Sequence, residues 1–273
     1  MIDRRLLLAG LAAAPLAAPL AGCTTTAKQG AKAPLRLATF NIWHNQGNWA
    51  ARLPLIVAEL KAQDADVIAL QEVLEDAAVG LPNQAVTIAE ALGGYEVHFV
   101  STDPEDSGRR YGNAILSRLP LLAHDTRKLA PLDDYRTAIR ARVDFHGRAI
   151  DVVCTHLAWK PEQAPTRAQQ IADLLAWLPQ DGAPLIIMGD FNAVQEDAGL
   201  AVLTSDRFFS VLPRGSAPTT LNPAKGHQPR VIDHIFAEAA YFSPVSGVVF
   251  ATDMTGGEHP SDHFGVAGAV SLR

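Results

Sequence analysis

The residues best suited to chemistry in this chain are carboxylates, amides and histidines that follow short apolar runs. Asp190 and Asn192 come soon after Ala183–Ile187, a run typical of a buried strand. Because alternate side chains of an extended chain share a face, these two would point one way and Phe191 the other. Gly, Asp and Asn also build ordinary turns, so this segment alone fits a turn and a site about equally well.

Other apolar segments of the chain end in the same way. The polar residues at these ends are Asn41, Glu72, His156, Asp190, Asn192, Asp233, Asp262 and His263. Each one alone has an ordinary explanation, since strands end in polar loops and a single His is usually a satisfied side chain. If these ends meet at one edge of stacked sheets, they form a single acidic pocket that carries histidines.

The oxygen ligands of such a pocket suit a hard divalent cation. Asn41 and Glu72 supply an amide and a carboxylate, and Mg²⁺ is typically held by one or two carboxylates together with a substrate phosphate. The sequence lacks the ligand spacing of a structural zinc site, the His-Glu-x-x-His pattern of metalloproteases and the Gly-x-Ser-x-Gly elbow of serine hydrolases. Metal-assisted attack of water on a phosphate ester is the chemistry that remains.

Strands and helices that could position these residues alternate along the chain. Apolar runs predict strands at residues 35–40, 66–70, 95–100, 111–117, 139–145, 149–155, 183–187 and 231–236, and a last strand that reaches residue 270. Helical spacing predicts helices near residues 53–60, 84–92 and 168–178. Pro54 would lie in the first turn of the first helix, and Thr166 would cap the third. No change of composition divides residues 34–273, so we expect one α/β domain.

The N-terminus predicts an export signal. Arg4 and Arg5 precede an apolar run that is too short for a membrane span, so residues 1–22 read as a secretory signal with a twin-arginine-like start. Leu20–Cys23 looks like a bacterial lipobox, which would leave Cys23 as a lipidated first residue, whereas the alternative is a plain signal with a chance Cys. Residues 23–33 would form a flexible tether, and the protein would be a lipoprotein on the periplasmic side of a bacterial membrane.

Composition and charge limit the kinds of partner. The 273 residues are 48% hydrophobic and 19% charged, as in packed globular proteins, and the formal net charge is −6. Removal of residues 1–22 takes away one acidic and two basic residues and leaves −7. This charge argues mildly against tight, sequence-independent binding of nucleic acid, although a locally basic cleft is compatible with it. Two cysteines exclude a disulfide framework, and Cys154 lies in an apolar run typical of a buried structural thiol.

Seven short motifs, taken in order, resemble the motif set of the endonuclease/exonuclease/phosphatase superfamily. They are Thr39-Phe40-Asn41, Leu70-Gln71-Glu72-Val73, Tyr111-Gly112-Asn113, Thr155-His156-Leu157, Gly189-Asp190-Phe191-Asn192, Ile232-Asp233-His234 and Ser261-Asp262-His263. The resemblance runs from about residue 35 to the end of the chain. It implies a deoxyribonuclease-I-like fold, a four-layer α-β-β-α sandwich of two packed mixed β-sheets flanked by helices.

The resemblance also implies roles for the metal-binding and water-activating residues. Glu72 would be the principal ligand of Mg²⁺ or Mn²⁺, with Asn41 beside it and Asp262 as a further contact. Asp190 would orient or deprotonate the attacking water, and Asn192 would hold the phosphate or the nucleophile.

The remaining roles implied by the resemblance concern the phosphate. His263 would stabilise the pentavalent transition state, with Asp233 fixing its ring and raising its pKa, and His156 would donate to another phosphoryl oxygen. Tyr111 and Asn113 would contact the substrate. Arg136 lies where many members of the family place a phosphate-facing Arg, but a surface Arg explains it nearly as well. No acidic residue is evident to orient His156, which weakens the case for deoxyribonuclease-type activity.

These observations predict an exported, metal-dependent and monomeric phosphodiesterase. Its substrate would be a phospholipid headgroup, a nucleotide, a nucleic acid or another phosphate ester, and the acidic charge and membrane tether slightly favour a small or lipid-like molecule. The alternative from another class is a catalytically inactive binding lipoprotein. Such proteins usually lose metal-binding or base residues, whereas Glu72, Asp190 and His263 are all present.

Overall fold

A computed structural model describes residues 33–273 of the protein. The predicted signal segment, the lipidation site Cys23 and the tether up to residue 32 lie outside the described residues. The strands are β1 (Leu35–Asn41), β2 (Val67–Asp76), β3 (Glu96–Ser101), β4 (Arg109–Ser117), β5 (Leu121–Lys128), β6 (Thr137–Phe145), β7 (Arg148–His156), β8 (Leu185–Asp190), β9 (Phe208–Ser210), β10 (Asp233–Glu238), β11 (Phe242–Phe250) and β12 (Gly265–Leu272). The α-helices are α1 (Trp49–Gln63), α2 (Gln84–Leu92) and α3 (Ala164–Trp177). Short 3-10 helices are η1 (Ala77–Val79), η2 (Leu132–Asp134), η3 (Pro161–Gln163), η4 (Ala198–Leu200) and η5 (Pro223–Lys225).

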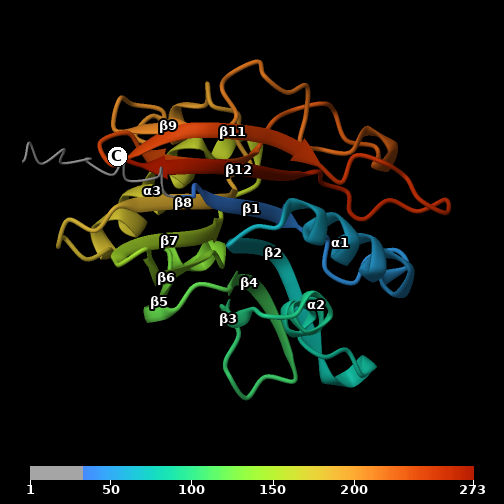
Figure 1. Cartoon of the computed structure of the whole chain (residues 1–273). Coiled ribbons are helices and arrows are strands. Elements are labelled where there is room, and N and C mark those ends of the chain that lie inside the picture. The colour runs from blue at the N-terminus through green and yellow to red at the C-terminus, as the bar shows by residue number, and fades with distance from the viewer. Residues whose placement is uncertain (1–32) are drawn as a thin grey trace, which may run out of the picture. The chain divides into compact units, whose positions relative to one another are not determined.

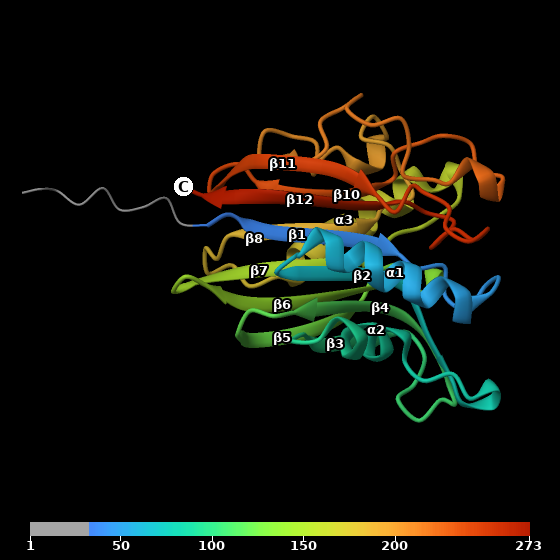
Figure 2. The same ribbon diagram turned by 45° about the vertical axis from the view of Figure 1, so that its right-hand side comes forward.

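The strands form two six-stranded mixed sheets with the same arrangement. Sheet A has the order β11-β12-β1-β2-β4-β3, and sheet B has the order β5-β6-β7-β8-β10-β9 (Figures 1 and 2). Each sheet has one parallel pair joined through a helix, β1-α1-β2 in sheet A and β7-α3-β8 in sheet B. A parallel crossover brings the carboxyl ends of both strands to the same edge. The polar side chains near the carboxyl ends of β1, β2, β7 and β8 can therefore lie close together.

The two sheets pack face to face, and helices cover their outer faces. Alternation along β1 sends Leu35 and Leu37 into the core between the sheets, while Ala38 and Phe40 face the core under α1 and α2. A third core lies between sheet B and α3 and contains Ile187. Figure 1 shows α1 and α2 beside β1, β2 and β4, and Figure 2 shows α1 in front of β1 and β2. The predicted four-layer α-β-β-α sandwich is confirmed.

Two of the predicted helix starts are wrong. Helix α1 begins at Trp49, where the side chain of Asn48 caps it by accepting from the N–H of Ala51, so Pro54 lies beyond the first turn. Helix α3 begins at Ala164, and Thr166 lies within it rather than at its cap. In α3 the first turn carries no apolar period, so spacing alone gives no boundary, whereas in α1 the period extends back to Trp49, which packs with Leu53 against the same core.

Two further features of the described chain bear on the sequence analysis. Cys154 is buried, as predicted, and its thiol lies 3.2 Å from Nε2 of Gln71. Burial raises the pKa of this thiol to about 12, so it stays protonated at neutral pH. Within residues 33–273, no helix combines the length and the apolar character that a membrane crossing needs.

Candidate active site

Strand β8 ends in a conformation that only glycine allows. Gly189 has φ +150°, and a Cβ there would lie 1.9 Å from the carbonyl oxygen of Thr155 on the neighbouring strand β7. Just beyond, Asn192 adopts φ +52°, and its N–H donates to Oδ1 of Asp190 at 2.8 Å. Phe191 points into the core, with its ring 5.2 Å from that of Phe236. The segment is thus a tight Asp/Asn turn that also presents a buried carboxylate.

The carboxylate of Asp190 is the point where side chains from both sheets meet. Its Oδ2 accepts from Nδ2 of Asn41 at 3.1 Å and lies 3.4 Å from Nε2 of His156 and 3.8 Å from Nε2 of His263. Asn41 ends β1 and His263 precedes β12, both in sheet A, whereas His156 and Asp190 end β7 and β8 of sheet B. The structure therefore brings together residues that the sequence places on separate strands.

The carboxyl of Asp190 has a pKa that suits proton transfer near neutral pH. Burial and the charge of Asp233 raise the pKa of its carboxyl, while the charge of His263 and hydrogen bonds from Asn192 and Asn41 oppose the rise, and the pKa reaches about 7. A general base works best when its pKa lies near the operating pH.

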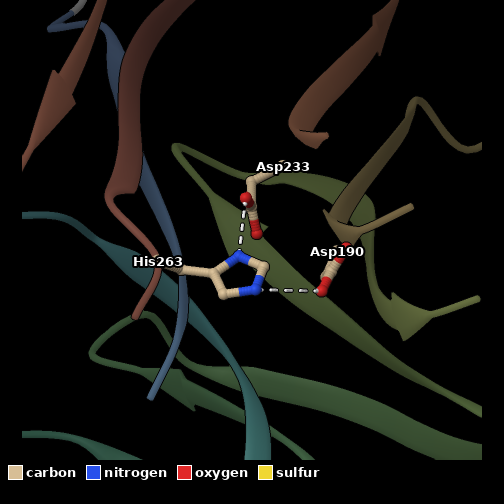
Figure 3. A group of neighbouring side chains, drawn as sticks. All are labelled: Asp190, Asp233 and His263. Atoms are coloured by element: carbon tan, nitrogen blue, oxygen red, sulfur yellow. Dashed lines mark hydrogen bonds and ion pairs between the residues drawn. The ribbon is translucent and has the colours of Figure 1, made fainter. Parts of the chain in front are cut away.

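His263 is held between two carboxylates. Its Nδ1 lies 3.0 Å from Oδ2 of Asp233, and its Nε2 faces Asp190 (Figure 3). Burial alone would lower the pKa of this ring, but the charges of Asp233 and Asp190 and the hydrogen bond to Asp233 raise it to about 10. The ring is therefore an imidazolium at neutral pH, and its Nε2–H can donate to an oxygen that gains negative charge.

His156 is in the opposite protonation state. Burial and the nearby charges of Arg136 and His263 lower its pKa well below the usual value, so the ring is neutral at physiological pH. Within residues 33–273, Asp190 is the only carboxylate with an oxygen within 4.0 Å of a ring nitrogen of His156. The structure thus supplies no separate acidic residue to orient this ring, in line with the sequence.

Glu72 is directed into the site by a β-bulge. Gln71 and Glu72 together oppose one residue, Asn113, because the register between β2 and β4 shifts there, and Glu72 adopts φ +59°. Its Oε1 accepts from Nδ2 of Asn41 at 3.1 Å, and its Oε2 lies 3.9 Å from Nε2 of His44. Among residues 33–273, Glu72 forms no ion pair with Lys or Arg. The amide of Asn41 turns its Nδ2 toward Glu72, and its Oδ1 accepts from the N–H of Trp43 at 3.0 Å. A partly buried carboxylate that no Lys or Arg neutralises fits a hard divalent cation.

A second group of side chains could also hold a metal ion by spacing alone. One ligand atom each from Asp190, Asp233 and His263 lies within 4.8 Å of the others. However, both nitrogens of His263 face carboxylates, and an imidazolium has no lone pair to give to a metal. The protonated ring already offsets part of the negative charge of the two carboxylates. We therefore consider Glu72 and Asn41 the better-suited pair.

The predicted substrate-contacting residues adjoin Glu72. A hydrogen bond and charge from Glu72 act on Tyr111, and burial together with that charge raises the pKa of its hydroxyl. Arg136 is not an exposed surface arginine, because its side chain is 13% exposed and its charge acts on both His156 and Tyr111. Asn113 is buried, and its Nδ2 donates to the backbone and hydroxyl oxygens of Thr137, so it ties β4 to the start of β6.

Asp262 has a partner that could not be expected from the sequence. Its Oδ2 lies 3.0 Å from Nε2 of His227, whose ring centroid is 6.2 Å from that of His263. A metal contact by Asp262 would compete with this hydrogen bond. His227 lies in a stretch without strand or helix periodicity, so no signal beyond its residue type could have identified it.

Arg52 is the other residue that the sequence analysis missed. It is fully buried and donates to five backbone carbonyls, of Ile42, Trp43, His44, Gln46 and Pro260, at 2.6–3.2 Å. Its guanidinium lies 5.2 and 5.5 Å from the ring centroids of Trp43 and Trp49. Arg52 thereby fastens the segment after Asn41 to the segment before Asp262.

Comparison with known proteins agrees with this geometry. The sequence profile of the Endonuclease/Exonuclease/phosphatase family matches residues 38–263. Protein angel homolog 2 of Mus musculus is 29% identical over 168 residues, and the protein of the same name from Bos taurus is 28% identical over 165. Each match covers 54% of this chain and 29% of the relative, so the chain spans less than a third of the length of these relatives.

Solved structures show the same fold at low identity. The human Nocturnin catalytic domain with a bound sulfate is 22% identical with a TM-score of 0.70, and the match covers 88% of this chain and 94% of that chain. Zebrafish (D. rerio) TDP2 complexed with a single-strand DNA product is 20% identical with a TM-score of 0.72, covering 88% and 100%. A family protein from Bacteroides vulgatus is 19% identical with a TM-score of 0.73, covering 89% and 100%. The profile match and the assembled site together show that the chain belongs to the endonuclease/exonuclease/phosphatase family, hydrolases that act on phosphate ester bonds.

Proposed function

We propose that this protein is a divalent-metal-dependent phosphodiesterase in which Asp190 activates the attacking water. The observation that carries the proposal is the convergence on Oδ2 of Asp190, where Asn41, His156 and His263 approach from both sheets within 3.1–3.8 Å. A buried carboxylate with a pKa of about 7 beside two N–H donors suits a reaction that moves one proton and builds negative charge on phosphate.

The proposed reaction is a single displacement at phosphorus. Asp190 takes a proton from a water molecule, the water oxygen bonds to phosphorus, and the bond to the leaving oxygen breaks. The leaving oxygen takes up a proton from solvent, which gives a monoester and an alcohol, and Asp190 releases its proton to solvent. The imidazolium of His263 and the neutral ring of His156 each donate an N–H to phosphoryl oxygens. These donors lower the barrier because the oxygens carry more negative charge in the transition state than in the ground state.

Glu72 and Asn41 are the residues that would hold Mg²⁺ or Mn²⁺, whose charge would polarise a phosphoryl oxygen. Support comes from the unneutralised carboxylate of Glu72 and from the amide that lies between it and Asp190. Asn192 supports the base, because its backbone N–H donates to Oδ1 of Asp190 and its side-chain Nδ2 donates to the carbonyl of Leu157.

Hydrolysis of bis(p-nitrophenyl) phosphate by the purified protein, with EDTA and after addition of Mg²⁺, tests this proposal. We expect Asp190→Asn to lower kcat by about a thousandfold while the circular dichroism spectrum stays unchanged. The matched control is Asp151→Asn, which alters another buried carboxylate, paired with Arg140 and Arg142 away from the site. Near wild-type, metal-dependent turnover by Asp190→Asn would refute the mechanism, and wild-type protein without turnover on any phosphate ester would indicate a binding protein instead.

We also propose that the protein is exported, acts as a monomer and is held at a bacterial membrane through a lipidated Cys23. The pattern of residues 1–23, with paired arginines, a short apolar run and Leu20-Ala21-Gly22 before the Cys, supports this localisation. Membrane fractionation of wild type and Cys23→Ser tests it. Release of the Cys23→Ser variant from the membrane fraction is expected, and equal membrane association of both forms would contradict it.

A further inference from the structure

A cavity of about 560 Å³ opens beside the candidate active site. Its lining includes His44 and Tyr111, which both contact Glu72, and also Arg109, Tyr135 and Arg136. Sites for small organic ligands usually enclose roughly 300–1,000 Å³, so the space suits one compact molecule rather than a duplex. The cavity and the catalytic centre share Arg136, whose charge acts on His156.

The two acidic residues in the lining already have hydrogen-bond partners in the protein. The carboxylate of Asp103 accepts from the backbone N–H of Tyr111 at 2.9 Å. The carboxylate of Asp134 accepts from the side-chain amides of Gln163 and Gln170 at 3.2 and 2.7 Å. These carboxylates hold the loops that build the cavity, which leaves them little capacity to attract a cationic ligand.

The two arginines, by contrast, have unused donors. The guanidinium of Arg136 forms no hydrogen bond within residues 33–273, its Nε is buried without a partner, and its nearest acidic contact is Asp134 at 3.8 Å. The side chain of Arg109 is 57% exposed and lies 3.7 Å from its ion-pair partner, Asp76. A guanidinium whose donors are not used in hydrogen bonds presents the planar fork that phosphate oxygens match.

Tyr135 adds an open aromatic surface to this cationic lining. It is 69% exposed, adjoins Arg136 in sequence, and has φ +52° at the end of η2. The ammonium group of Lys128 lies 5.0 Å from its ring centroid. Exposed aromatic rings next to basic side chains are the usual stacking surface for a nucleobase. A quaternary ammonium headgroup would also stack on tyrosine, but here it would meet Lys128, Arg109 and Arg136.

We propose that this cavity is a subsite for a nucleotide, with the base on Tyr135 and a second phosphate on Arg109 and Arg136. The inference rests on the proposed phosphodiesterase function, because it takes the scissile phosphate to lie at Asp190 and Glu72. It narrows the substrate to a small phosphodiester that contains a nucleoside phosphate. Phospholipids with a choline headgroup and long duplexes fit this lining less well.

Binding measured without turnover tests the subsite independently of catalysis. Isothermal titration of the full chain in EDTA would compare adenosine diphosphate, ribose 5-phosphate, inorganic phosphate and phosphocholine. We expect adenosine diphosphate to bind most tightly. Tyr135→Ala should weaken adenosine diphosphate by about five- to a hundredfold, because stacking on an aromatic ring contributes that much, and should leave inorganic phosphate unaffected. Arg109→Gln should weaken adenosine diphosphate more than it weakens adenosine monophosphate.

The matched controls lie at the other end of sheet B. Arg148 begins β7 and lies 5.3 Å from the ring centroid of Tyr241, which repeats the pairing of a cation with a tyrosine away from the site, although Tyr241 is partly buried. Tyr241→Ala and Arg148→Gln should bind adenosine diphosphate like the wild type.

The possible results distinguish failure of the nucleotide subsite from failure of the proposed phosphodiesterase function. Metal-dependent hydrolysis of bis(p-nitrophenyl) phosphate without preferential, Tyr135-dependent binding of adenosine diphosphate would overturn the subsite and leave the phosphodiesterase standing. Phosphocholine binding that depends on Tyr135 would likewise overturn it in favour of a choline headgroup. Tyr135-dependent nucleotide binding in a protein without turnover would support the subsite and refute the phosphodiesterase.

Discussion

Replacement of Asp233 by Asn should shift the pH dependence of activity to lower pH. The proposed reaction needs His263 charged, and Asp233 is the first of the causes that raise the pKa of His263 to about 10 against the effect of burial. Asn is nearly isosteric and can still hydrogen-bond to Nδ1, but it carries no charge. Without that charge, burial lowers the pKa of His263 toward the ordinary histidine value of about 6.5, and only the charges of Asp190 and Asp262 still oppose the fall.

The size of the effect follows from the charged fraction of His263. At pH 8 a group with a pKa of about 10 is almost fully protonated, whereas one with a pKa of about 6.5 is protonated to about 3%. The variant should therefore lose up to about thirtyfold in kcat/KM at pH 8 from this cause, which corresponds to about 2 kcal/mol of transition-state stabilisation. At pH 5.5 the same ring is about 90% protonated, so the deficit from this cause nearly disappears.

The base should change in the same direction. The charge of Asp233 is one cause of the raised pKa of Asp190, so its removal lowers that pKa and keeps the base ionised at lower pH. Both limbs of the variant's pH profile then move toward acid.

The assay is kcat/KM for bis(p-nitrophenyl) phosphate between pH 5.5 and 10 with saturating Mg²⁺, plotted as the ratio of variant to wild type. Asp151→Asn serves as the control for loss of a buried carboxylate and should give a flat ratio. A ratio for Asp233→Asn that is low but equally flat would mean that Asp233 acts only by position. That result would refute the electrostatic role assigned to it.

Three further changes test other parts of the site. Glu72→Gln should raise the Mg²⁺ concentration that gives half-maximal activity by about tenfold or more, measured by titration of metal-free enzyme, and an unchanged midpoint would move the metal elsewhere. Gly189→Ala should lower the free energy of unfolding in urea by about 2 kcal/mol or more, because its Cβ would meet the carbonyl of Thr155 at 1.9 Å, and an unchanged urea midpoint would contradict this account. Arg52→Met should cost on the order of 3 kcal/mol in the same measurement, since five backbone carbonyls lose a donor, two of them in buried contacts, and a loss below about 1 kcal/mol would show that water replaces it.

The central strands could be predicted from the sequence because buried strands are recognisable by their apolar composition. Strands β2 and β8 are nearly continuous apolar runs at their centres, and their polar ends stand out against that background. The peripheral strand β5 has no such continuous apolar run. It pairs only with β6 and is largely exposed, so its residues Leu121–Lys128 alternate little between apolar and polar.

The part of the site that could not be predicted depends on contacts between distant segments. Arg52 donates to the carbonyl of Pro260, 208 positions away, and a sequence does not show which backbone carbonyl will accept from a side chain. His227 similarly meets Asp262 only because two loops come together. The bulge that directs Glu72 depends on the pairing of β2 with β4, whereas the motif around Glu72 reveals only that a carboxylate is present.

The equivalent topology of the two sheets explains why the site has two chemically different halves. The parallel strands of sheet A end near Glu72 and Asn41, which offer oxygen ligands, and those of sheet B end in Asp190 and His156, which offer a base and an N–H donor. Asn41 connects the halves, because its single amide group donates to both Glu72 and Asp190 at 3.1 Å. Two acidic side chains are thereby held around one amide, an arrangement that a divalent cation and the imidazolium of His263 would stabilise by adding positive charge. Since neither sheet alone carries both halves, the site forms only when the apolar faces of the two sheets pack together.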